Sequence, residues 1–462
     1  MSIVVLDIGK THAKAVLLDE SGREIVAHRR RNEILAGPPY PHHDAEELWR
    51  WAVATLAMLP ERDRITTIVP IHHGCAGALL AGDTLALPLQ DYEFTGPDDL
   101  GADFDEVFDP FDATFSPPLP LGQNFGRQVL WQQEWFPNVF ARVTDILPGP
   151  QYWAWLLSGV KAVERTSLGA HSHLWRPLDD DFSGLVDRRG WRPLFPPLRR
   201  AWDVLGPIRP DLARTTGLPA DCRVLVGMHD SNAALLPHLI RREGSFTVVS
   251  TGTWIIVMAP GSGLKRLDPA LDHLAGVDVF GRPVPTARAM GGREFEILAA
   301  GDTGEATEED LDALLASGAM ALPSFHVESG PFMGREGRIV GTAGDRHIAL
   351  ASLYVASMID VMMELLGAEG PIIVDGPFAR NDVIMRTLAT WHPDRAPAPV
   401  AGGVGEGALL LASWPCDRAR GHDPRPATPF EGDRAARLHA YRRSWRERVG
   451  VGEQAGADPP RP

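Results

Sequence analysis

The chain has 462 residues, of which 44% are hydrophobic and 23% charged, and this balance indicates a globular protein large enough for two or more domains. Its 45 basic and 60 acidic residues give a net charge of −15, which argues against a protein that binds the phosphate backbone of nucleic acids. The three cysteines, Cys75, Cys222 and Cys416, are too few and too far apart for a disulfide framework and fit a reducing compartment.

The start of the chain carries no secretory pattern, because it has no basic segment and Asp7 interrupts the apolar run. Apolar stretches such as residues 152–160 are too short to cross a bilayer. We therefore expect a cytoplasmic protein without a membrane partner.

The first predicted element is a β-hairpin over residues 3–19, in which two apolar runs flank a polar turn at Gly9. Asp7 ends the first run, and three polar residues follow the glycine: Lys10, Thr11 and Lys14. Backbone amides of such a turn can hold phosphate oxygens, and a carboxylate can hold Mg²⁺. Taken alone, the segment is explained better as a plain hairpin with surface lysines.

A strand over residues 65–69 is followed by His72, His73 and Gly74, which could reach a polyol. An ordinary loop explains a histidine pair equally well. None of the histidine pairs has the spacing of a metal site, so we expect no zinc. Two proline-rich stretches, 88–125 and 177–219, are predicted to be loops with short strands that decorate a core.

Residues 223–240 form a predicted strand, turn and helix, with Asp230 where the strand ends and the helix begins. A carboxylate at such a junction can accept a proton from a substrate hydroxyl. Asp230 or Ser231 could equally serve only as the helix N-cap.

The same two patterns return about half a chain later. Residues 246–259 predict a second hairpin around the turn Thr251, Gly252 and Thr253, and residues 371–390 predict a second strand, turn and helix capped by Asn381 or Asp382. The repeat predicts two related lobes. We place the first at 1–243, the second at 244–448, and a disordered tail at 449–462.

In order and spacing, these segments resemble the FGGY family of carbohydrate kinases. The quoted segments, together with GLPADCRVLVGMHD and GGVGEGALLLA, run from residue 3 to about residue 412. The resemblance implies an α/β fold of two ribonuclease-H-like lobes, as in actin and hexokinase, with an interdomain cleft. It also implies ATP-dependent phosphorylation of a small-molecule sugar with Mg²⁺, no nucleic acid partner, and leaves a homodimer open.

The resemblance also implies a role for individual residues. Asp230 looks like the catalytic base, and Asp7 with Asp230 like the magnesium carboxylates. Sugar contacts fall at His73, Gly74, Asp91 and His229. The first phosphate turn is Gly9, Lys10, Thr11 and Lys14, the second is Thr251, Gly252 and Thr253, and the adenosine segment is Gly376, Asn381 and Gly405.

Three departures from the family pattern limit this transfer. Lys10 stands where Thr is usual, so it could contact phosphate or face solvent. Pro377 replaces a glycine in the adenosine turn. The sugar segment has the sequence IHHGCAG, where xylulose kinases have Gln-Met-His-Gly. The segments TSLGAHSHLW, GMHD and LQDYE are closer to rhamnulose-, fuculose- and autoinducer-type kinases, which predicts L-rhamnulose or L-fuculose as substrate. The alternatives are a kinase for another pentulose or a polyol, a nucleotide-binding regulator of the same fold, and a sugar-binding module without kinase activity.

Overall fold

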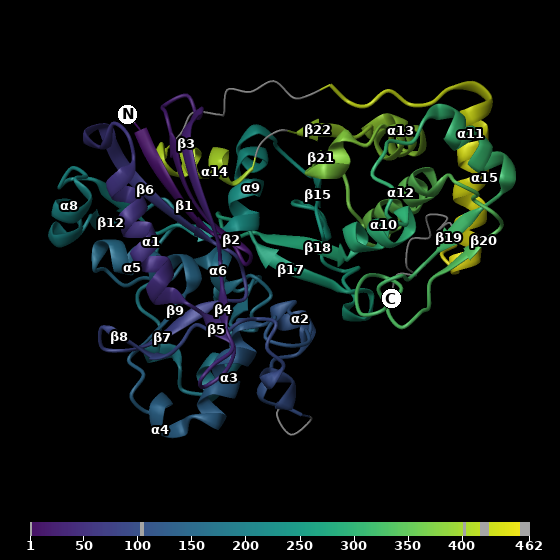
Figure 1. The fold of residues 1–462 in the computed structure, drawn as a ribbon. Coiled ribbons are helices and arrows are strands. Elements are labelled where there is room, and N and C mark those ends of the chain that lie inside the picture. Colours follow the sequence, from purple (N-terminus) through teal and green to yellow (C-terminus); the bar gives the residue numbers. More distant parts are fainter. Residues whose placement is uncertain (1, 102–105, 401–402, 416–424, 453–462) are drawn as a thin grey trace. The chain divides into compact units, whose positions relative to one another are not determined.

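The computed structural model describes residues 2–101, 106–400, 403–415 and 425–452, which form two compact units (Figure 1). Unit 1 comprises residues 1–243, 274–284 and 402–420, and unit 2 comprises 244–273, 285–401 and 421–462. The first break falls at the predicted boundary after residue 243. Two segments expected in the second lobe, 274–284 and 402–420, belong instead to unit 1. Most of the predicted tail, residues 453–462, lies outside the described residues.

The main sheet of unit 1 has the order β12-β13-β6-β1-β2-β3, and β14 also pairs with β6. β1 runs antiparallel to β2 and parallel to β6, and β6 runs parallel to β13. The predicted hairpin over residues 3–19 is therefore confirmed. The strands span β1 (Ser2–Ile8), β2 (His12–Leu18), β3 (Glu24–Arg31), β6 (Ile65–His72), β12 (Val204–Pro207), β13 (Arg223–Leu225) and β14 (Met228–His229).

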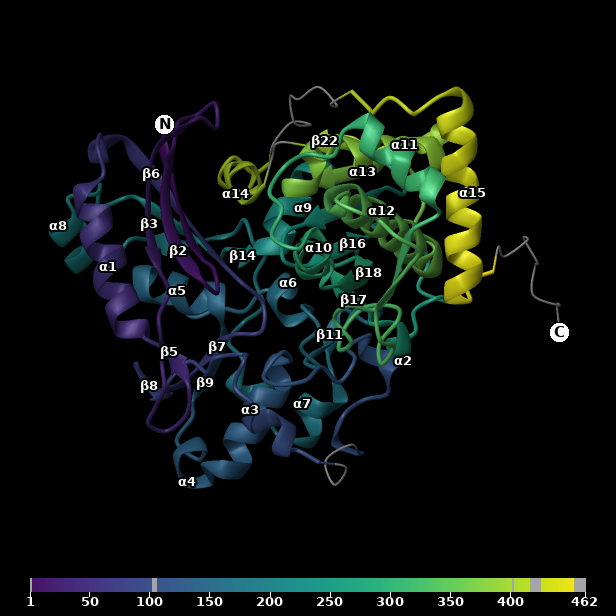
Figure 2. The same cartoon turned by 45° about the vertical axis from the view of Figure 1, so that its right-hand side comes forward.

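Helices cover both faces of this sheet (Figures 1 and 2). α1 (Ala45–Met58) and α5 (Gly149–Ser158) lie on one face, and α9 (Asp230–Arg241) and α14 (Val404–Ala412) on the other. Every residue of β1 is buried, as expected for a central strand covered on both sides. α8 (Pro210–Thr216) packs against α1.

The proline-rich stretches differ from their prediction. In the described part of 88–125 there are short helices, η2 (Gly96–Asp99) and α2 (Phe111–Thr114), and no named strand. The stretch 177–219 contributes β12 to the edge of the main sheet, and Trp191 and Ile208 from the same stretch are buried in the core of unit 1. The other elements of unit 1 are β4 (Ile34–Leu35), β5 (His42–His43), η1 (Arg62–Arg64), β7 (Gly77–Ala81), β8 (Thr84–Leu87), α3 (Phe125–Trp135), α4 (Pro137–Phe140), β9 (Asp145–Pro148), α6 (Arg165–Leu168), β10 (Trp175–Arg176), β11 (Asp181–Phe182), α7 (Gly184–Arg188) and η4 (Arg192–Leu194), and β17 (His273–Val277) begins at its border.

The sheet of unit 2 repeats the topology of unit 1, with the strand sequence β18-β16-β15-β21-β22. β15 is antiparallel to β16 and parallel to β21, and β21 is parallel to β22. The duplication predicted from the two hairpins is confirmed. The strands span β15 (Thr247–Thr251), β16 (Ile255–Met258), β18 (Pro283–Ala289), β21 (Ile372–Asp375) and β22 (Ala398–Val400).

The core helix of unit 2 is α12 (His347–Leu366). It is the one helix in the described residues that is long and apolar enough to cross a membrane, so our expectation that every apolar stretch is too short was wrong. In the structure 89% of the apolar stretch of α12 is buried among other side chains.

The remaining elements of unit 2 are η5 (Pro269–Leu271), α10 (Gly291–Ala299), α11 (Glu308–Ser317), β19 (Met320–Leu322), β20 (Arg338–Val340), η6 (Pro377–Arg380), α13 (Asp382–Trp391), η7 (Pro393–Arg395) and α15 (Gly432–Val449).

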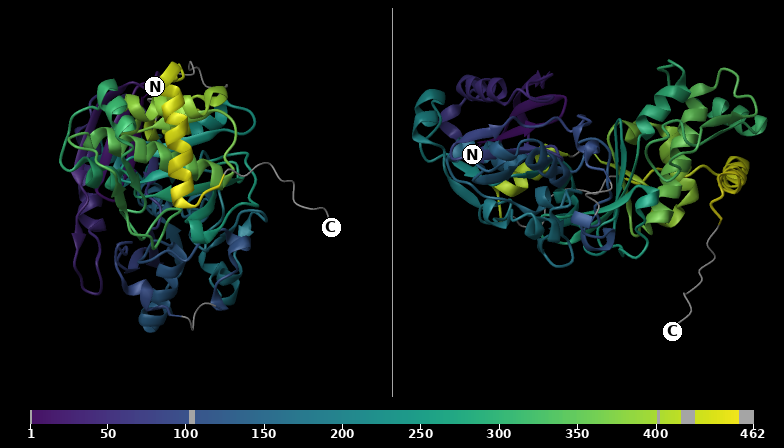
Figure 3. Two further views of the ribbon diagram at one scale, coloured as in Figure 1. Left: turned by 90° about the vertical axis from the view of Figure 1, so that its right-hand side faces the viewer. Right: turned by 90° about the horizontal axis from the view of Figure 1, so that it is seen from below.

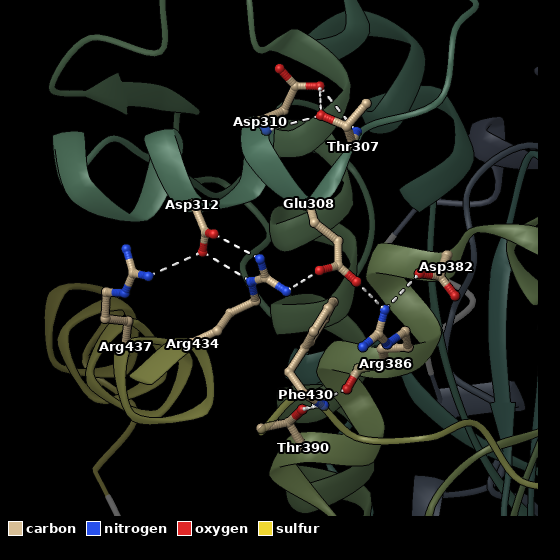
Figure 4. A network of polar contacts seen from close by, with 10 residues as sticks. All are labelled: Thr307, Glu308, Asp310, Asp312, Asp382, Arg386, Thr390, Phe430, Arg434 and Arg437. Atoms are coloured by element: carbon tan, nitrogen blue, oxygen red, sulfur yellow. Dashed lines mark hydrogen bonds and ion pairs between the residues drawn. The ribbon is translucent and has the colours of Figure 1, made fainter. Parts of the chain in front are cut away.

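The C-terminal helix α15 lies along the outer side of the unit 2 helices, where it is drawn in yellow (Figures 2 and 3). On its surface side, Arg434 donates to Asp312 of α11 at 2.7 and 2.9 Å and also pairs with Glu308 (Figure 4). On its buried side, Arg442 donates to Asp360 of α12 at 2.6 and 2.8 Å. Charged groups therefore hold α15 from both sides.

Candidate active site

Asp7 and Asp230 are brought together at neighbouring strand ends in unit 1. Asp7 is the last residue but one of β1, and Asp230 opens α9 directly after β14, which pairs with β6 beside β1. Burial and the nearby charge of Asp230 raise the pKa of Asp7 to about 6, while Lys14, whose Nζ lies 3.6 Å from Asp7 Oδ2, opposes the rise. The two predicted magnesium carboxylates thus lie within electrostatic reach of each other.

Asp230 does not cap its helix. The N-cap of α9 is His229, without a side-chain capping bond, and Asp230 is the first helical residue. Its Oδ1 accepts a hydrogen bond from the Ser231 amide at 2.6 Å, and a third of its side chain (33%) is exposed. The N-cap alternative is therefore wrong, and the carboxylate is open to a substrate.

His229 links Asp230 to the predicted sugar loop. Its Nε2 lies 3.2 Å from Asp230 Oδ1. A Cβ added to Gly74 would lie 2.9 Å from the same nitrogen, so the ring needs the space that glycine leaves. Burial lowers the pKa of His229, although Asp230 partly opposes this, which leaves a neutral imidazole.

Three buried histidines surround the same loop. The ring of His73 lies 4.2 Å from that of His72 and 5.5 Å from that of His43, measured between centroids. Burial lowers the pKa of His72 to about 4 and that of His43 to about 3, and holds that of His73 well below its usual value. Among the described residues, no group of three or more His, Cys, Asp or Glu side chains is arranged to hold a metal ion. The lowered pKa values make these rings neutral, and His72 and His73 each bond a backbone carbonyl through Nδ1.

Lys10 does not face solvent, which was one of the two positions considered for it, and its contact with phosphate stays a prediction. Its ammonium pairs with Asp91, lies 3.4 Å from Glu93 Oε2, and sits 4.8 Å from the centre of the Tyr92 ring. It therefore ties the first predicted phosphate turn to the loop expected to contact sugar. The Oδ1 atom of Asp91 accepts hydrogen bonds from the Lys10 ammonium and from the Glu93 amide, the latter at 3.2 Å.

The first turn is tight, and Asn32, which directly follows β3, holds it by hydrogen bonds. The Gly9 amide donates to the His12 carbonyl at 3.0 Å, and a Cβ on Gly9 would lie 2.9 Å from that oxygen. Asn32 donates its side-chain amide to the Gly9 carbonyl and its backbone amide to the Thr11 carbonyl, both at 2.9 Å. Asn32 was not anticipated, because it follows a strand far along the chain from the turn it holds.

The second turn lies in unit 2, where Thr251 has a structural role. Its hydroxyl donates to the Asp375 carbonyl at 2.6 Å and accepts from the Phe378 amide at 3.2 Å. Gly376, at φ 91°, is required because a Cβ there would lie 2.0 Å from the Thr251 carbonyl. Thr253 is exposed, and a Cβ on Gly252 would meet no atom within 4 Å. Gly252 and Thr253 are thus the open part of the turn.

The predicted adenosine segment is divided between the units. Asn381, with Gly376 in unit 2, caps α13 by accepting from the Ile384 amide at 3.0 Å, which confirms one of the two caps considered. Its Nδ2 donates to Ser352 Oγ at 3.0 Å. Gly405 lies in α14 of unit 1. Two residues on, a Cβ at Gly407 would lie 1.9 Å from the Ala233 carbonyl, so close packing of α14 on α9 explains part of this glycine-rich segment.

Known proteins are similar to this chain in both sequence and fold. Residues 243–420 match the C-terminal domain of the FGGY carbohydrate kinases. A crystal structure of a carbohydrate kinase from Novosphingobium aromaticivorans is 39% identical, with a TM-score of 0.87 over 98% of this chain and 99% of that one. The chain belongs to the FGGY family of carbohydrate kinases. The predicted family, the fold class and the assignment as a sugar kinase are thereby confirmed.

Two curated proteins are more distant relatives of this FGGY chain. A probable L-xylulose kinase of Pasteurella multocida (strain Pm70) is 24% identical over 54% of the chain and 54% of that relative. An L-xylulose/3-keto-L-gulonate kinase of Escherichia coli (strain K12) is 26% identical over 60% and 57%. Each match spans little more than half of the curated relative. Neither of the two is named for rhamnulose or fuculose, the sugars we expected.

Proposed function

We propose that this FGGY chain transfers the γ-phosphoryl group of ATP to a hydroxyl of a small neutral ketose, such as L-rhamnulose or L-fuculose. The observation that carries the proposal is the partly exposed carboxylate of Asp230, which lies within electrostatic reach of Asp7 and 3.2 Å from the His229 ring that packs against Gly74. In this role Asp230 accepts the proton of the attacking hydroxyl. His73 and His229 provide neutral nitrogens for sugar hydroxyls.

Asp7 and Asp230 suit a divalent cation. Two carboxylates near each other in a buried place repel, which is one reason for the raised pKa of Asp7. We propose that they hold Mg²⁺, which offsets the charge of the phosphates when it is bound. The amides of Lys10 and Thr11 in the first turn, and those of the open turn at Gly252 and Thr253, suit phosphate oxygens.

The charges around Asp230 favour a neutral sugar over a sugar acid. Four carboxylates belong to this region, with two ammonium groups against them: Asp7, Asp91, Glu93 and Asp230, and Lys10 and Lys14. The lowered pKa values of His72, His73 and His229 mean that the imidazoles add no positive charge. A carboxylate on the substrate would add a further negative charge, which costs free energy in such a place.

L-Xylulose is the second candidate. It is favoured by the names of the two curated relatives, one of which also carries a sugar acid, 3-keto-L-gulonate, in its name. L-Rhamnulose and L-fuculose are favoured by the sequence segments around Asp91, Thr166 and Asp230. All of these sugars require the same base and the same phosphoryl transfer.

A coupled assay of ADP release tests the proposal. The panel holds L-rhamnulose, L-fuculose, L- and D-xylulose, L-ribulose, glycerol and 3-keto-L-gulonate, each with MgATP. We expect the highest kcat/KM for one of the neutral ketoses and the lowest for the acid. Nucleotide binding without sugar-dependent ADP release would instead favour a regulator, and a preference for glycerol would favour a polyol kinase.

A further inference from the structure

We propose that Glu164 and Thr166 are positioning residues that hold the Asp230 base in place through the main chain of His229. The inference rests on the role proposed above for Asp230. Neither residue is close to it in sequence, and neither was expected to take part in the site.

The path consists of directed hydrogen bonds. Glu164 Oε2 accepts from the Thr166 hydroxyl at 2.6 Å and from the Thr166 and Ser167 amides at 2.9 and 3.4 Å. The Thr166 hydroxyl accepts in turn from the His229 amide at 3.1 Å. Because the hydroxyl proton is committed to Glu164, its lone pairs face the amide, and the direction of each bond is determined.

The position of the His229 amide affects the orientation of Asp230 directly. His229 is the N-cap of α9, with φ −63° and ψ 139°, so its backbone decides where the helix begins and where the next residue, Asp230, points. The ring of the same residue lies against Gly74 and 3.2 Å from Asp230 Oδ1. Main chain and side chain of His229 are thus each restrained, and Asp230 follows both.

A buried glutamate such as Glu164 costs more free energy than a helix cap requires. Glu164 is 1% exposed, and burial raises its pKa to about 7, against the opposing effect of its bonds to Thr166 and Ser167. It caps α6, a helix of four residues, where Ser, Thr or Asn would serve without burying a carboxylate. A carboxylate acceptor makes shorter and stronger hydrogen bonds, which suits a group that must fix a hydroxyl.

Small displacements of a catalytic group have large effects on rate. A shift of about 1 Å can cost about 100-fold in turnover. Loss of the Thr166 hydroxyl removes the described partner of the His229 amide without touching Asp230 itself. Turnover should therefore fall while the affinity for ATP is kept.

The experiment compares Thr166→Val with Thr166→Ser in the full chain. Valine removes the hydroxyl at nearly the same volume, and serine restores it. The matched control is Thr216→Val, because Thr216 is also buried and its hydroxyl donates to the Leu212 carbonyl at 2.7 Å, in α8. We expect Thr166→Val to lower kcat at least tenfold with KM for ATP within twofold, and both Thr166→Ser and Thr216→Val to stay within threefold of the parent.

Amide hydrogen exchange over residues 226–234 supplies a measurement that does not depend on activity. We expect faster exchange of this segment in Thr166→Val and in Glu164→Gln, and no change in Thr216→Val. Faster exchange with an unchanged kcat overturns the positioning role, and so does unchanged exchange in a folded Thr166→Val protein. If no sugar is phosphorylated even by the parent chain, the proposed function fails, and the exchange result still decides whether Thr166 holds the His229 backbone. If Thr166→Val does not fold, Glu164→Gln with the same two measurements gives the decision.

Discussion

At the scale of single residues, the site is built from side chains whose surroundings change their chemistry. Asp230 is partly exposed, while Asp7 is 8% exposed and has its pKa raised to about 6. Burial therefore favours the protonated form of Asp7, while the side chain of Asp230 is accessible to a substrate hydroxyl. Substitutions at these positions and at Lys10 separate the roles proposed for them.

Asp230→Asn should keep ATP binding and lose turnover. The amide occupies the same volume but cannot accept a proton, and a positioned base contributes about 10²–10⁴-fold to a rate. Steady-state kcat, together with calorimetric titration of ATP, measures both properties. Turnover close to that of the parent would remove Asp230 from the mechanism.

Asp7→Asn should raise the stability of the protein at pH 8 in the absence of Mg²⁺. The folded-state pKa of Asp7, about 6, lies above the value of 3.8 for the free side chain, so the folded state favours the protonated form. The contribution of Asp7 to the stability of the parent protein is complete below about pH 4 and is lost as the pH rises through 6. This loss amounts to roughly 3 kcal/mol of the free energy of unfolding. Melting temperatures of parent and variant should agree near pH 4 and separate by pH 8. Equal separation at both pH values would contradict this expectation.

Lys10→Met should raise KM for the sugar about tenfold and leave KM for ATP within twofold. The substitution keeps most of the aliphatic stem but leaves Asp91, which is 5% exposed, without its cation, so the sugar loop loses its anchor. Initial rates with each substrate varied in turn measure the two constants. Asp91→Asn should act in the same direction. A rise confined to KM for ATP would return Lys10 to the phosphate role implied by the family resemblance.

At the scale of elements, α15 tests how buried and exposed charges differ in strength. Asp360 of α12 is 1% exposed and accepts from Arg442 at 2.6 and 2.8 Å, from Arg446 at 3.2 Å and from His392 at 2.8 Å. The outer network in Figure 4 joins Arg434 to Glu308, and about half of the Glu308 side chain is exposed. Breaking a buried ion pair costs about 3–5 kcal/mol, and an exposed pair contributes about 0.2–1 kcal/mol.

Asp360→Asn should therefore lower the free energy of unfolding by about 3 kcal/mol, and the control Arg434→Gln by about 1 kcal/mol or less. Burial alone would raise the pKa of Asp360, but hydrogen bonds from His392 and Arg442 outweigh it and lower the pKa to about 2. The carboxylate thus stabilises the fold above about pH 4, and this contribution is lost as the pH falls through 2. Urea titrations from pH 2 to pH 7, with hydrogen exchange of α15, measure the difference. Equal losses in the two variants would contradict this view.

At the scale of the whole molecule, unit 1 is discontinuous in sequence, and this has a consequence for folding. α14, which follows residue 402, packs against α9, β6 and β1, and Trp414 stacks on Trp202 with ring centroids 4.3 Å apart. A fragment of residues 1–243 lacks this helix, so it exposes apolar surface of β1 and α9.

Residues 1–243 expressed alone should not unfold cooperatively. The same fragment joined through a flexible linker to residues 402–420 should regain a sharp thermal transition, because α14 again covers the sheet. Far-ultraviolet circular dichroism during heating compares the two. A cooperative transition in the short fragment would show that α14 is dispensable for unit 1.

Much of the fold could be predicted from local patterns. Both hairpins and both strand-turn-helix units were located correctly, because apolar runs broken by one glycine or one helix cap act over a few residues. Asp7, Asp230 and Gly74 could be named as candidates for the same reason, since each follows or ends a recognisable strand. Asn32 and Thr166 were missed because each bonds to a residue distant in sequence, and Glu164 because it reaches His229 only through Thr166.

The sequence by itself determined two duplicated α/β lobes, the FGGY resemblance and the candidate base, because strand periodicity, turn glycines and the order of motifs are local properties. Only the tertiary structure decided the partners of the polar side chains. It paired Lys10 with Asp91 and Thr251 with the Asp375 carbonyl, and it placed α14 in unit 1. Hydrogen bonds and ion pairs form between groups that are close in space, and for these residues the closeness arises only when the sheets and helices are assembled.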